Sequence, residues 1–537
     1  MTTDTAQNDV LIVGAGMAGL TAAAYLAKAG LKVLLCEKEK RSGGLVNSFE
    51  YRGFVFDGGI RATENSGTLL PMLRQLGIDV HFMPNPVSIG IGKDVATISS
   101  KDSLADYQAL LERQFPENKS DIRAIIQEIE RVMGYLDVLY GIDNPLFLDL
   151  KANPGYMFKT ILPWLLKYRL TVPKIAKLST PVAEYLPRFT DNRALVDIIA
   201  QHFFQKTPAF FALSYFSIYL DYRYPKGGTG VLPQAIERFV LERGGSIQTE
   251  TEITSVDPAR RQASDTAGNS YRYRKLVWAA DMNTLYRVID LSSLGDSAAV
   301  RSIQAQQQAM SGKTGGDSVF TLYLAVNQDH SHFAKISTGH FFYTPSTTGL
   351  SRAGLAELTG SSPDRFISDK AQIVDWLKRH LELNTFEISI PALRDPSLAP
   401  AGKTGLIVSL LFDYRLTRHI REMGWYDEFR ELMSDRIIEV LDASIYPGLK
   451  TAVFDSFTST PLTIERIAGT HQGAITGWAY TNDFIPAESR MPKIAKSVLT
   501  PIPDTLQAGQ WTYSPSGLPV SILTGKLAAD RVVRDLS

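Results

Sequence analysis

The chain has 537 residues, about three times the length of a usual domain, so we expect several parts within one compact enzyme. Its 56 basic and 56 acidic residues balance at a sequence pI of about 7.1, which excludes a global electrostatic field for nucleic acid. The single cysteine, Cys36, excludes an intrachain disulfide, and the eight histidines lack metal-ligand spacing, so we expect no bound metal.

The start of the chain is acidic, unlike the basic segment that opens a signal peptide, so we expect a cytoplasmic protein. The apolar run 10–27 contains three motif glycines and predicts a strand, a loop and a helix. A second apolar run, 207–220, has 14 residues, whereas a bilayer span needs about 20. We therefore expect no membrane span.

A strand, a glycine turn and a helix follow one another at the start of the fold. The strand is Val10–Val13, the turn is Gly14-Ala15-Gly16-Met17-Ala18-Gly19, and helical sequence continues from Leu20 to Lys28. Gly14 permits the tight turn, Gly16 lets the backbone approach a pyrophosphate, and Gly19 allows close packing of helix on strand. The helix N-terminus then faces the anion. A plain glycine-rich turn would not need the flanking elements, so this order predicts a dinucleotide site.

A second strand, 31–36, ends at Glu37, 18 residues after Gly19. A carboxylate at this position accepts hydrogen bonds from the adenosine ribose and disfavours a 2′-phosphate. Beyond it, Gly43 and Gly44 can bring backbone amides towards the pyrophosphate, and Arg41 can neutralise phosphate charge. These glycines, with Gly58 and Gly59 after a predicted hairpin over 48–56, favour FAD over NAD. The alternative for them is a pair of surface turns.

The segment 155–177 combines apolar and aromatic residues with five cations and no acid. This composition predicts a surface that lies on an anionic membrane with the cations at the phosphates. The alternative is a helical lid that packs on the core and exposes its basic face. The aromatic cluster over 202–219 either lines a long apolar tunnel or belongs to the core, and we expect His202 to be a packed histidine.

Later segments repeat the alternation of strand, glycine turn and helix. Lys275–Ala280 predicts a strand of the dinucleotide domain, with Asp281 capping the next helix. Strands are also expected at 319–326 and 406–412. The remaining ordered motifs are Tyr224–Gly230 before the helix 231–243, Gly244–Thr249, Glu252–Val256, Pro391–Lys403, Pro461–Arg466 and Ala508–Pro519 before the helix 520–531.

Taken in this order, the motifs resemble flavoproteins of the phytoene desaturase, carotenoid isomerase and retinol saturase group, within the amine-oxidase-like FAD superfamily. The resemblance implies an α/β fold: a Rossmann-like FAD-binding domain, an interleaved α+β substrate-binding domain, and a helical lid or membrane-facing subdomain. FAD binding is expected in 8–84, 226–290 and 461–537, and substrate binding in 85–225 and 291–460. The turn 514–517 departs from the family because relatives often carry more glycine there.

The predicted cofactor is FAD. The amides of Gly517 and Leu518, at the positive end of the last helix, are expected to face the flavin pyrimidine. The resemblance also places the strand that contains Ile253 and Val256 beside the adenine. The predicted FAD-binding residues are Gly14, Gly16, Met17, Ala18, Gly19, Glu37, Lys38, Arg41, Gly43, Gly44, Gly58, Gly59, Ile253, Ala280, Gly509, Gly517 and Leu518.

Four residues are candidates for catalysis because they follow turns that are expected to meet the flavin: Arg61, Glu64, Trp511 and Tyr513. For Arg61 and Glu64 the alternative is a surface ion pair. The expected partners are an apolar small molecule or lipid, with peripheral membrane contact and no nucleic acid.

The predicted reaction is flavin-dependent redox chemistry at carbon-carbon double bonds of a long isoprenoid or carotenoid. Desaturation, saturation and isomerisation share this geometry, so the direction and the electron partner stay open. Two alternatives are an amine-oxidase-like flavoenzyme and a non-catalytic prenyl- or lipid-binding protein of the Rab escort type.

Overall fold

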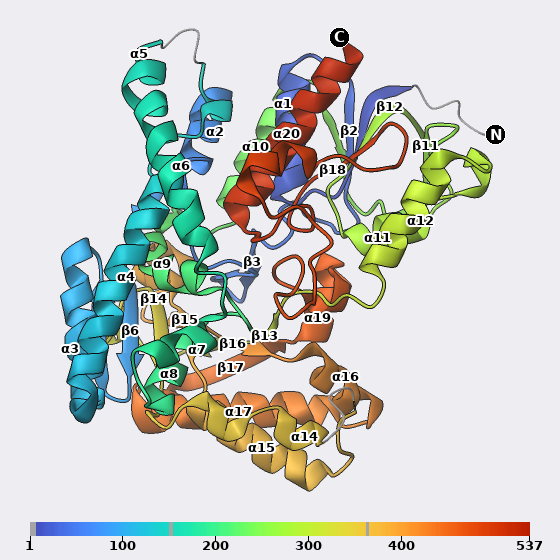
Figure 1. Cartoon of the computed structure of the whole chain (residues 1–537). Helices are drawn as coiled ribbons and strands as arrows, with labels where there is room; N and C mark the ends of the chain where they lie inside the picture. The colour runs from blue at the N-terminus through green and yellow to red at the C-terminus, as the bar shows by residue number, and fades with distance from the viewer. Residues whose placement is uncertain (1–6, 150–153, 361–364) are drawn as a thin grey trace.

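Figure 1 shows the computed structural model of the chain, which describes residues 7–149, 154–360 and 365–537. The first six residues, which contribute to the expectation about location, lie outside the described residues. Two large sheets organise the molecule, one at the upper right of Figure 1 and one in its lower half.

The first sheet has seven strands in the order β10-β11-β12-β1-β2-β9, with β18 also beside β12. Strands β9, β2, β1, β12 and β18 run parallel, which confirms the Rossmann-like arrangement expected from the glycine motif. The strands are β1 (Asn8–Val13), β2 (Val33–Cys36), β9 (Ser246–Gln248), β10 (Ile253–Asp257), β11 (Gln262–Asp265), β12 (Ser270–Trp278) and β18 (Thr505–Gln507).

Side-chain alternation along β1 explains how helices cover both faces of this sheet. Val10 and Ile12 pack against α1 (Met17–Lys28), α10 (Val231–Glu242) and α20 (Leu518–Leu536). Leu11 and Val13 pack on the other face with α11 (Met282–Val288) and α12 (Ala298–Met310). Asp281 caps α11 as expected, because its side chain accepts a hydrogen bond from the Thr284 amide at 3.0 Å.

The second sheet also has seven strands, in the order β17-β13-β16-β15-β14-β6-β7, and joins two distant parts of the chain. Its parallel pair is β14 with β6; the other neighbours are antiparallel. The predicted strands at 319–326 and 406–412 are confirmed as β13 and β16. The strands are β6 (Val87–Ile91), β7 (Asp94–Ile98), β13 (Ser318–Val326), β14 (His340–Thr344), β15 (Phe386–Ser389), β16 (Thr404–Phe412) and β17 (Val453–Ser459).

Helices cover the lower face of the second sheet in Figure 1. They are α15 (Lys370–Leu383), α16 (Tyr414–Glu422) and α17 (Tyr426–Ser444), and their apolar side chains meet Phe320, Leu322 and Leu324 of β13. The opposite face of the sheet therefore carries Val319 and Thr321, which line the cavity described below.

A third core joins β6 and β7 to α3 (Leu104–Gln114), α4 (Lys119–Tyr140), α8 (Arg193–Ala200) and α9 (Ala209–Asp221). The apolar run 207–220 is thus accounted for by a helix of this core. There are also two small two-stranded antiparallel sheets: β3 (Ser48–Tyr51) with β4 (Phe54–Asp57), and β5 (Phe82–Pro84) with β8 (Arg223–Pro225).

The basic segment 155–177 forms an arm at the upper left of Figure 1. It consists of α5 (Pro154–Tyr156), the π-helical turn η4 (Met157–Ile161) and α6 (Leu162–Ala176), close to α2 (Leu69–Leu76) in this view. One side packs on α4, where the Trp164 indole donates a hydrogen bond to the Val138 carbonyl at 2.5 Å.

Candidate functional site

A cavity of about 1040 Å³ extends from the carboxyl end of β1 to the upper face of the second sheet. One end is lined by glycine turns and helix N-termini of the first sheet, and the other by aromatic and polar side chains. We call these the cofactor groove and the substrate chamber. Both belong to one continuous space, so a molecule in the groove can meet a molecule in the chamber.

The turn after β1 leaves space for an anion at the N-terminus of α1. Gly14 has a φ of +97°, which favours glycine, whereas a Cβ built on Gly16 would meet no atom within 4 Å. A Cβ on Gly19 would lie 1.9 Å from the Gly14 carbonyl oxygen, so Gly19 lets α1 pack tightly on the turn. Helix α1 has no acidic residue in its first turn and no side-chain cap, so its amides are available to a phosphate.

Glu37 lies at the end of β2 with its carboxylate held by two backbone amides. Oε2 accepts a hydrogen bond from Ala15 at 2.7 Å and Oε1 accepts one from Glu39 at 3.0 Å. Burial raises the pKa of Glu37, and the two amides oppose this shift. The carboxylate keeps free lone pairs on the groove side, which suits a ribose diol.

The second glycine pair closes the groove beside α1. The Gly43 amide donates to the Ala15 carbonyl at 2.8 Å, and Gly43 and Gly44 have φ values of +123° and +59°. A Cβ on Gly44 would lie 3.3 Å from the Cα of Gly16, so the two turns touch. A side chain on Gly43 or Gly44 would narrow the groove, which explains why both residues are glycine.

Asp57 directly precedes Gly58 and Gly59, and it joins this turn to the segment before α10. It is buried, and its carboxylate accepts hydrogen bonds from the Tyr224 hydroxyl at 2.7 Å and the Thr229 amide at 2.9 Å. A Cβ on Gly59 would lie 2.0 Å from the Leu45 carbonyl oxygen. Residues 57–59 are therefore fixed between two other parts of the groove.

The far wall of the groove comes from the end of the chain. Gly509 has a φ of +103°, and its amide donates to the Thr524 hydroxyl at 2.9 Å. Gly517 precedes α20, whose first turn contains no acid. A Cβ on Gly517 would lie 3.7 Å from Oε1 of Glu64, so this helix N-terminus faces a candidate catalytic carboxyl.

The structure brings nearly all predicted FAD-binding residues to this cavity. Gly19 is the exception, since it packs behind the turn, and Val256 is buried in β10 rather than exposed to the groove. The residues that line the cavity are Gly14, Gly16, Met17, Ala18, Glu37, Lys38, Arg41, Gly43, Gly44, Gly58, Gly59, Ile253, Ala280, Gly509, Gly517 and Leu518.

Three of the four candidate catalytic residues line the cavity: Arg61, Glu64 and Trp511. Tyr513 does not; it is buried, and its hydroxyl donates to the Ser489 carbonyl at 3.0 Å. Arg61 is only 4% exposed, so it does not belong to a surface ion pair. Its guanidinium donates to the Asp57 carbonyl at 2.8 Å.

Glu64 is a carboxyl of this site whose pKa lies near neutral pH. Burial raises the pKa of Glu64 to about 7, and the Asp221 carboxylate adds to this shift. Such a group can be protonated or charged under ordinary conditions, which suits proton exchange with a bound molecule.

The wall of the substrate chamber is aromatic. His202 is not part of it: its ring contacts Phe203 and Phe342, and burial lowers its pKa to about 4, as expected for a packed histidine. The cluster over 202–219 is divided, since some members line the chamber and others, such as Phe216, belong to the core. The wall residues are Tyr140, Phe204, Phe211, Tyr215, Ile218 and Tyr222.

Sequence reasoning missed the floor of the chamber, which is polar: Thr321, His340, Glu387 and Ser409. These residues lie on central strands of the second sheet, which is covered on both sides. The sequence contained one signal of this floor: Glu387 is a charged residue within the short strand 386–389. A buried central strand seldom carries an unpaired charge.

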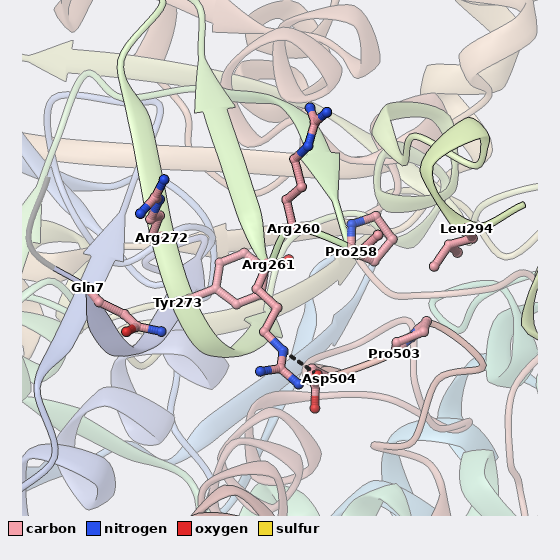
Figure 2. A pocket seen from close by; sticks show the side chains of 10 residues that line it. Gln7, Pro258, Arg260, Arg261, Arg272, Tyr273, Leu294, Pro503 and Asp504 are labelled. Atoms are coloured by element: carbon pink, nitrogen blue, oxygen red, sulfur yellow. Dashed lines mark hydrogen bonds and ion pairs between the residues drawn. The ribbon is translucent and has the colours of Figure 1, made fainter. Parts of the chain in front are cut away.

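A second hollow, of about 620 Å³, lies on the outer side of the first sheet. Its arginines do not converge on one point: Figure 2 shows Arg261 directed at Asp504, whereas Arg260 and Arg272 point the opposite way. The Arg261 guanidinium lies 2.6 Å from the Asp504 carboxylate. We assign no ligand to this hollow.

Among the described residues, no cluster of histidine, cysteine, aspartate and glutamate has the arrangement of a metal site. No helix in the described part of the chain is long and apolar enough to cross a bilayer.

Comparison with known proteins identifies several relatives. The sequence model of the family described as "Flavin containing amine oxidoreductase" matches residues 17–328, more than half of the chain. An inactive all-trans-retinol 13,14-reductase from Danio rerio is 24% identical over 86% of this chain and 76% of its own length.

Two further relatives match almost the whole chain. A chloroplastic prolycopene isomerase from Daucus carota is 22% identical over 98% of this chain and 80% of its own length. A lycopene-forming phytoene desaturase from Pantoea ananas is 23% identical over 98% of this chain and 99% of its own length. These relatives confirm the resemblance inferred from the motifs.

Solved structures confirm the fold. An oxidoreductase from Methanosarcina mazei superposes with a TM-score of 0.61 at 14% identity, covering 98% of this chain and 99% of its own. Cyclohexylamine oxidase from Brevibacterium oxydans superposes with a TM-score of 0.58 at 13% identity, covering 99% of this chain and 100% of its own.

Proposed function

This chain belongs to the family of flavin-containing amine oxidoreductases, and from that premise we propose that it acts on carbon-carbon double bonds of a long apolar isoprenoid or carotenoid. FAD is its cofactor, and the glycine turns, Glu37 and the helix N-termini of the groove fit that molecule. The names of its relatives, a retinol reductase, a prolycopene isomerase and phytoene desaturases, support this class of substrate.

The single observation that carries the proposal is the continuity of the cavity. Two contacts link the groove to the chamber: Arg61 donates to the Gly59 carbonyl at 2.6 Å, and a Cβ on Gly517 would lie 3.7 Å from Oε1 of Glu64. An elongated apolar chain in the chamber would therefore meet a cofactor held in the groove. Aromatic walls exclude water from that contact.

FAD supplies the hydride and electron chemistry when it is bound. The residues of this chain orient and shield it. The amides of Leu518 and its neighbours, at the positive end of α20, would favour negative charge on a flavin held beside them. Glu64 is placed to hold or release a proton in the chamber.

The direction of the reaction is tested by electron counting. Desaturation transfers two electrons from substrate to FAD and then to an acceptor such as a quinone or oxygen, saturation transfers two electrons the other way, and isomerisation leaves the count unchanged. We would incubate oxidised and reduced protein anaerobically with cis-polyenes, and record product mass together with the flavin spectrum.

Any of these three products supports the proposal and assigns the reaction. If polyenes of several lengths and the flavin stay unchanged while an amine is oxidised, the amine-oxidase alternative replaces it. A protein that retains a lipid but takes up no FAD would instead be a lipid carrier of the Rab escort type.

We further infer that the enzyme is cytoplasmic and takes its substrate from a membrane surface through the arm. Three large apolar side chains of the arm are mostly exposed: Phe158 at 70%, Leu166 at 67% and Leu170 at 70%. Such exposure is unusual for apolar side chains of this size. Lys167 and Arg169 lie among them. Exposed apolar side chains among cations match an anionic bilayer rather than water.

A further inference from the structure

Two arginines are buried between the cofactor groove and the floor of the substrate chamber. Arg61 is 4% exposed and Arg394 is 7% exposed. Arginine keeps its charge even when it is buried. Within the described part of the chain, neither guanidinium forms an ion pair with a carboxylate. A buried cation without such a partner costs free energy, so a purely structural role does not explain two of them at one place.

Neutral oxygens hold both guanidinium groups. Arg61 donates to the Gly59 carbonyl at 2.6 Å and to the Ser409 hydroxyl at 3.1 Å. Arg394 donates to the Arg61 carbonyl at 3.0 Å and to the Ser389 hydroxyl at 2.5 Å. The two side chains therefore connect a turn that lines the groove with β15 and β16 of the second sheet.

Asp57 is the first of two carboxylates that lie near these arginines. Its two oxygens accept hydrogen bonds from the Tyr224 hydroxyl at 2.7 Å and the Ser48 hydroxyl at 2.8 Å, as an ionised carboxylate does. Tyr224 also contacts Arg394, whose guanidinium lies 4.0 Å from the centre of the tyrosine ring. The negative charge of Asp57 therefore acts on Arg394 across this ring.

Glu387 is the second carboxylate, and it lies on the floor of the chamber. Burial alone would raise the pKa of Glu387, but the His340 hydrogen bond and the charges of Arg61 and Arg394 lower it overall. Burial lowers the pKa of His340, so its ring is neutral and adds no positive charge. Glu387 is therefore an anion at neutral pH.

Two positive and two negative charges thus lie together beside the cavity, and we call them the charge cluster: Asp57, Arg61, Glu387 and Arg394. Arg61 and Glu387 line the cavity, and the other two residues are buried. The net charge of the cluster is zero only while both arginines are present. Because charges interact strongly where water is excluded, a molecule held in the groove beside Gly59 would interact with this cluster.

Hydride transfer changes the charge of a bound flavin. It brings two electrons and one proton to FAD, which thereby gains one negative charge, and the reverse transfer removes that charge. Negative charge beside the groove opposes the uptake of hydride, whereas positive charge favours it. Without Arg61 and Arg394, the carboxylates of the cluster would oppose it.

Resting on the proposed function, we propose that the charge cluster sets the reduction potential of bound FAD. Arg61 and Arg394 offset the two carboxylates, so the groove can hold the extra negative charge of the reduced cofactor. Arg394 acts through Arg61 and Tyr224, which makes it a positioning residue.

Variants that change one charge at a time test this proposal. The reduction potential of the FAD-loaded protein is measured by redox titration against a reference dye, at about pH 8, where Glu64 is mostly charged. Arg394→Met should lower the potential by about 30–60 mV, which corresponds to a roughly 10- to 100-fold change in a two-electron equilibrium. Glu387→Gln should raise the potential by a similar amount, because it removes a negative charge.

The double variant gives the sharpest result. Arg394→Met combined with Glu387→Gln restores the balance of charge, so its potential should return towards that of the unmodified protein. Arg394→Lys keeps the charge and should shift the potential least. Lys526→Met is the matched control and should leave the potential unchanged. Lys526 is also a buried cation, with a side chain that is 9% exposed, but it pairs with Asp530 at 2.6 Å.

Every other outcome is equally decisive. If both single variants lower the potential, or the double variant lies below Arg394→Met, disturbed packing replaces the charge cluster as the cause. If all variants keep the potential of the unmodified protein, the cluster does not act on the flavin, and the proposed function stands without it. If Arg394→Met takes up no FAD, Glu387→Gln decides alone: a raised potential supports the proposal and an unchanged one overturns it. If the unmodified protein takes up no FAD, the proposed function fails as well.

Discussion

At the scale of single residues, Gly16 offers a clean test of the cofactor groove. A Cβ at this position meets no protein atom within 4 Å, so Gly16→Val should leave the apoprotein folded. The added side chain occupies the pyrophosphate path, and overpacking of about 1–3 kcal/mol predicts roughly 10- to 100-fold weaker FAD binding. Flavin content and FAD titration check this.

Gly134→Ala is the matched control, because a Cβ there also meets open space, on the helix α4 far along the chain from the groove. Unchanged FAD affinity in Gly16→Val would contradict the assignment of this turn to the pyrophosphate.

Glu64 should make stability depend on pH near neutrality. Burial raises its pKa to about 7 from an ordinary value of 4.5, so its contribution is complete below about pH 4.5 and is lost as the pH rises through 7. The unfolding free energy of the FAD-free protein should fall over this range, and Glu64→Gln should reduce that fall.

Urea unfolding at a series of pH values measures this dependence, with Glu130→Gln as the isosteric control at an exposed position. If the unfolding free energy of Glu64→Gln and of the unmodified protein depends on pH in the same way, Glu64 titrates like an ordinary exposed acid.

Single residues also show which parts of the site the sequence could predict. The sequence could predict the roles of Gly14, Gly16 and Glu37, because the glycine motif and its acid lie within one short stretch of the chain. Glu387 and Ser409 come together only through the pairing of β15 with β16. That register depends on the whole sheet, so a single sequence could not predict the polar floor.

At the scale of elements, the arm gives a prediction about membranes. Replacing Lys167 and Arg169 with Glu should weaken binding to anionic vesicles by about 2 kcal/mol or more, near 30-fold, since each cation contributes about 1 kcal/mol. Leu166→Ser with Leu170→Ser should weaken it through lost apolar contact. Vesicle co-sedimentation and circular dichroism measure binding and folding together.

Leu241→Ser is the control, because this leucine is also exposed, at 49%, but lies on α10, which packs on the first sheet. If the arm variants sediment with vesicles as the unmodified protein does, the arm is a lid with a solvated basic face.

Element prediction succeeded where periodicity was local. The strands β1, β13 and β16 follow from short apolar runs rich in β-branched residues, and the helices α10 and α20 follow from runs with glycine and proline at their starts. The joining of β6 and β7 to strands more than 200 residues away does not follow from any local pattern. The division of the chain into FAD-binding and substrate-binding parts therefore stays a proposal.

At the scale of the whole molecule, the first sheet and the helices packed on it are assembled from three distant parts of the chain. Val10, Leu232 and Ile522 belong to one apolar core, which closes only when the first, middle and last segments meet. The groove is lined by the same three segments, so a bound cofactor would touch all of them.

FAD binding should therefore stabilise the folded protein. FAD that binds only the folded state adds about 2.7 kcal/mol of stability at 100 times its dissociation constant. We expect FAD to raise the unfolding temperature of the stripped protein by several degrees and to protect the last helix, α20, from proteolysis. Gly16→Val should show neither effect at the same FAD concentration, because its fold is intact and its groove is blocked. Equal shifts in both proteins would mean that FAD binds elsewhere, and no shift in the unmodified protein would mean that the groove does not hold it.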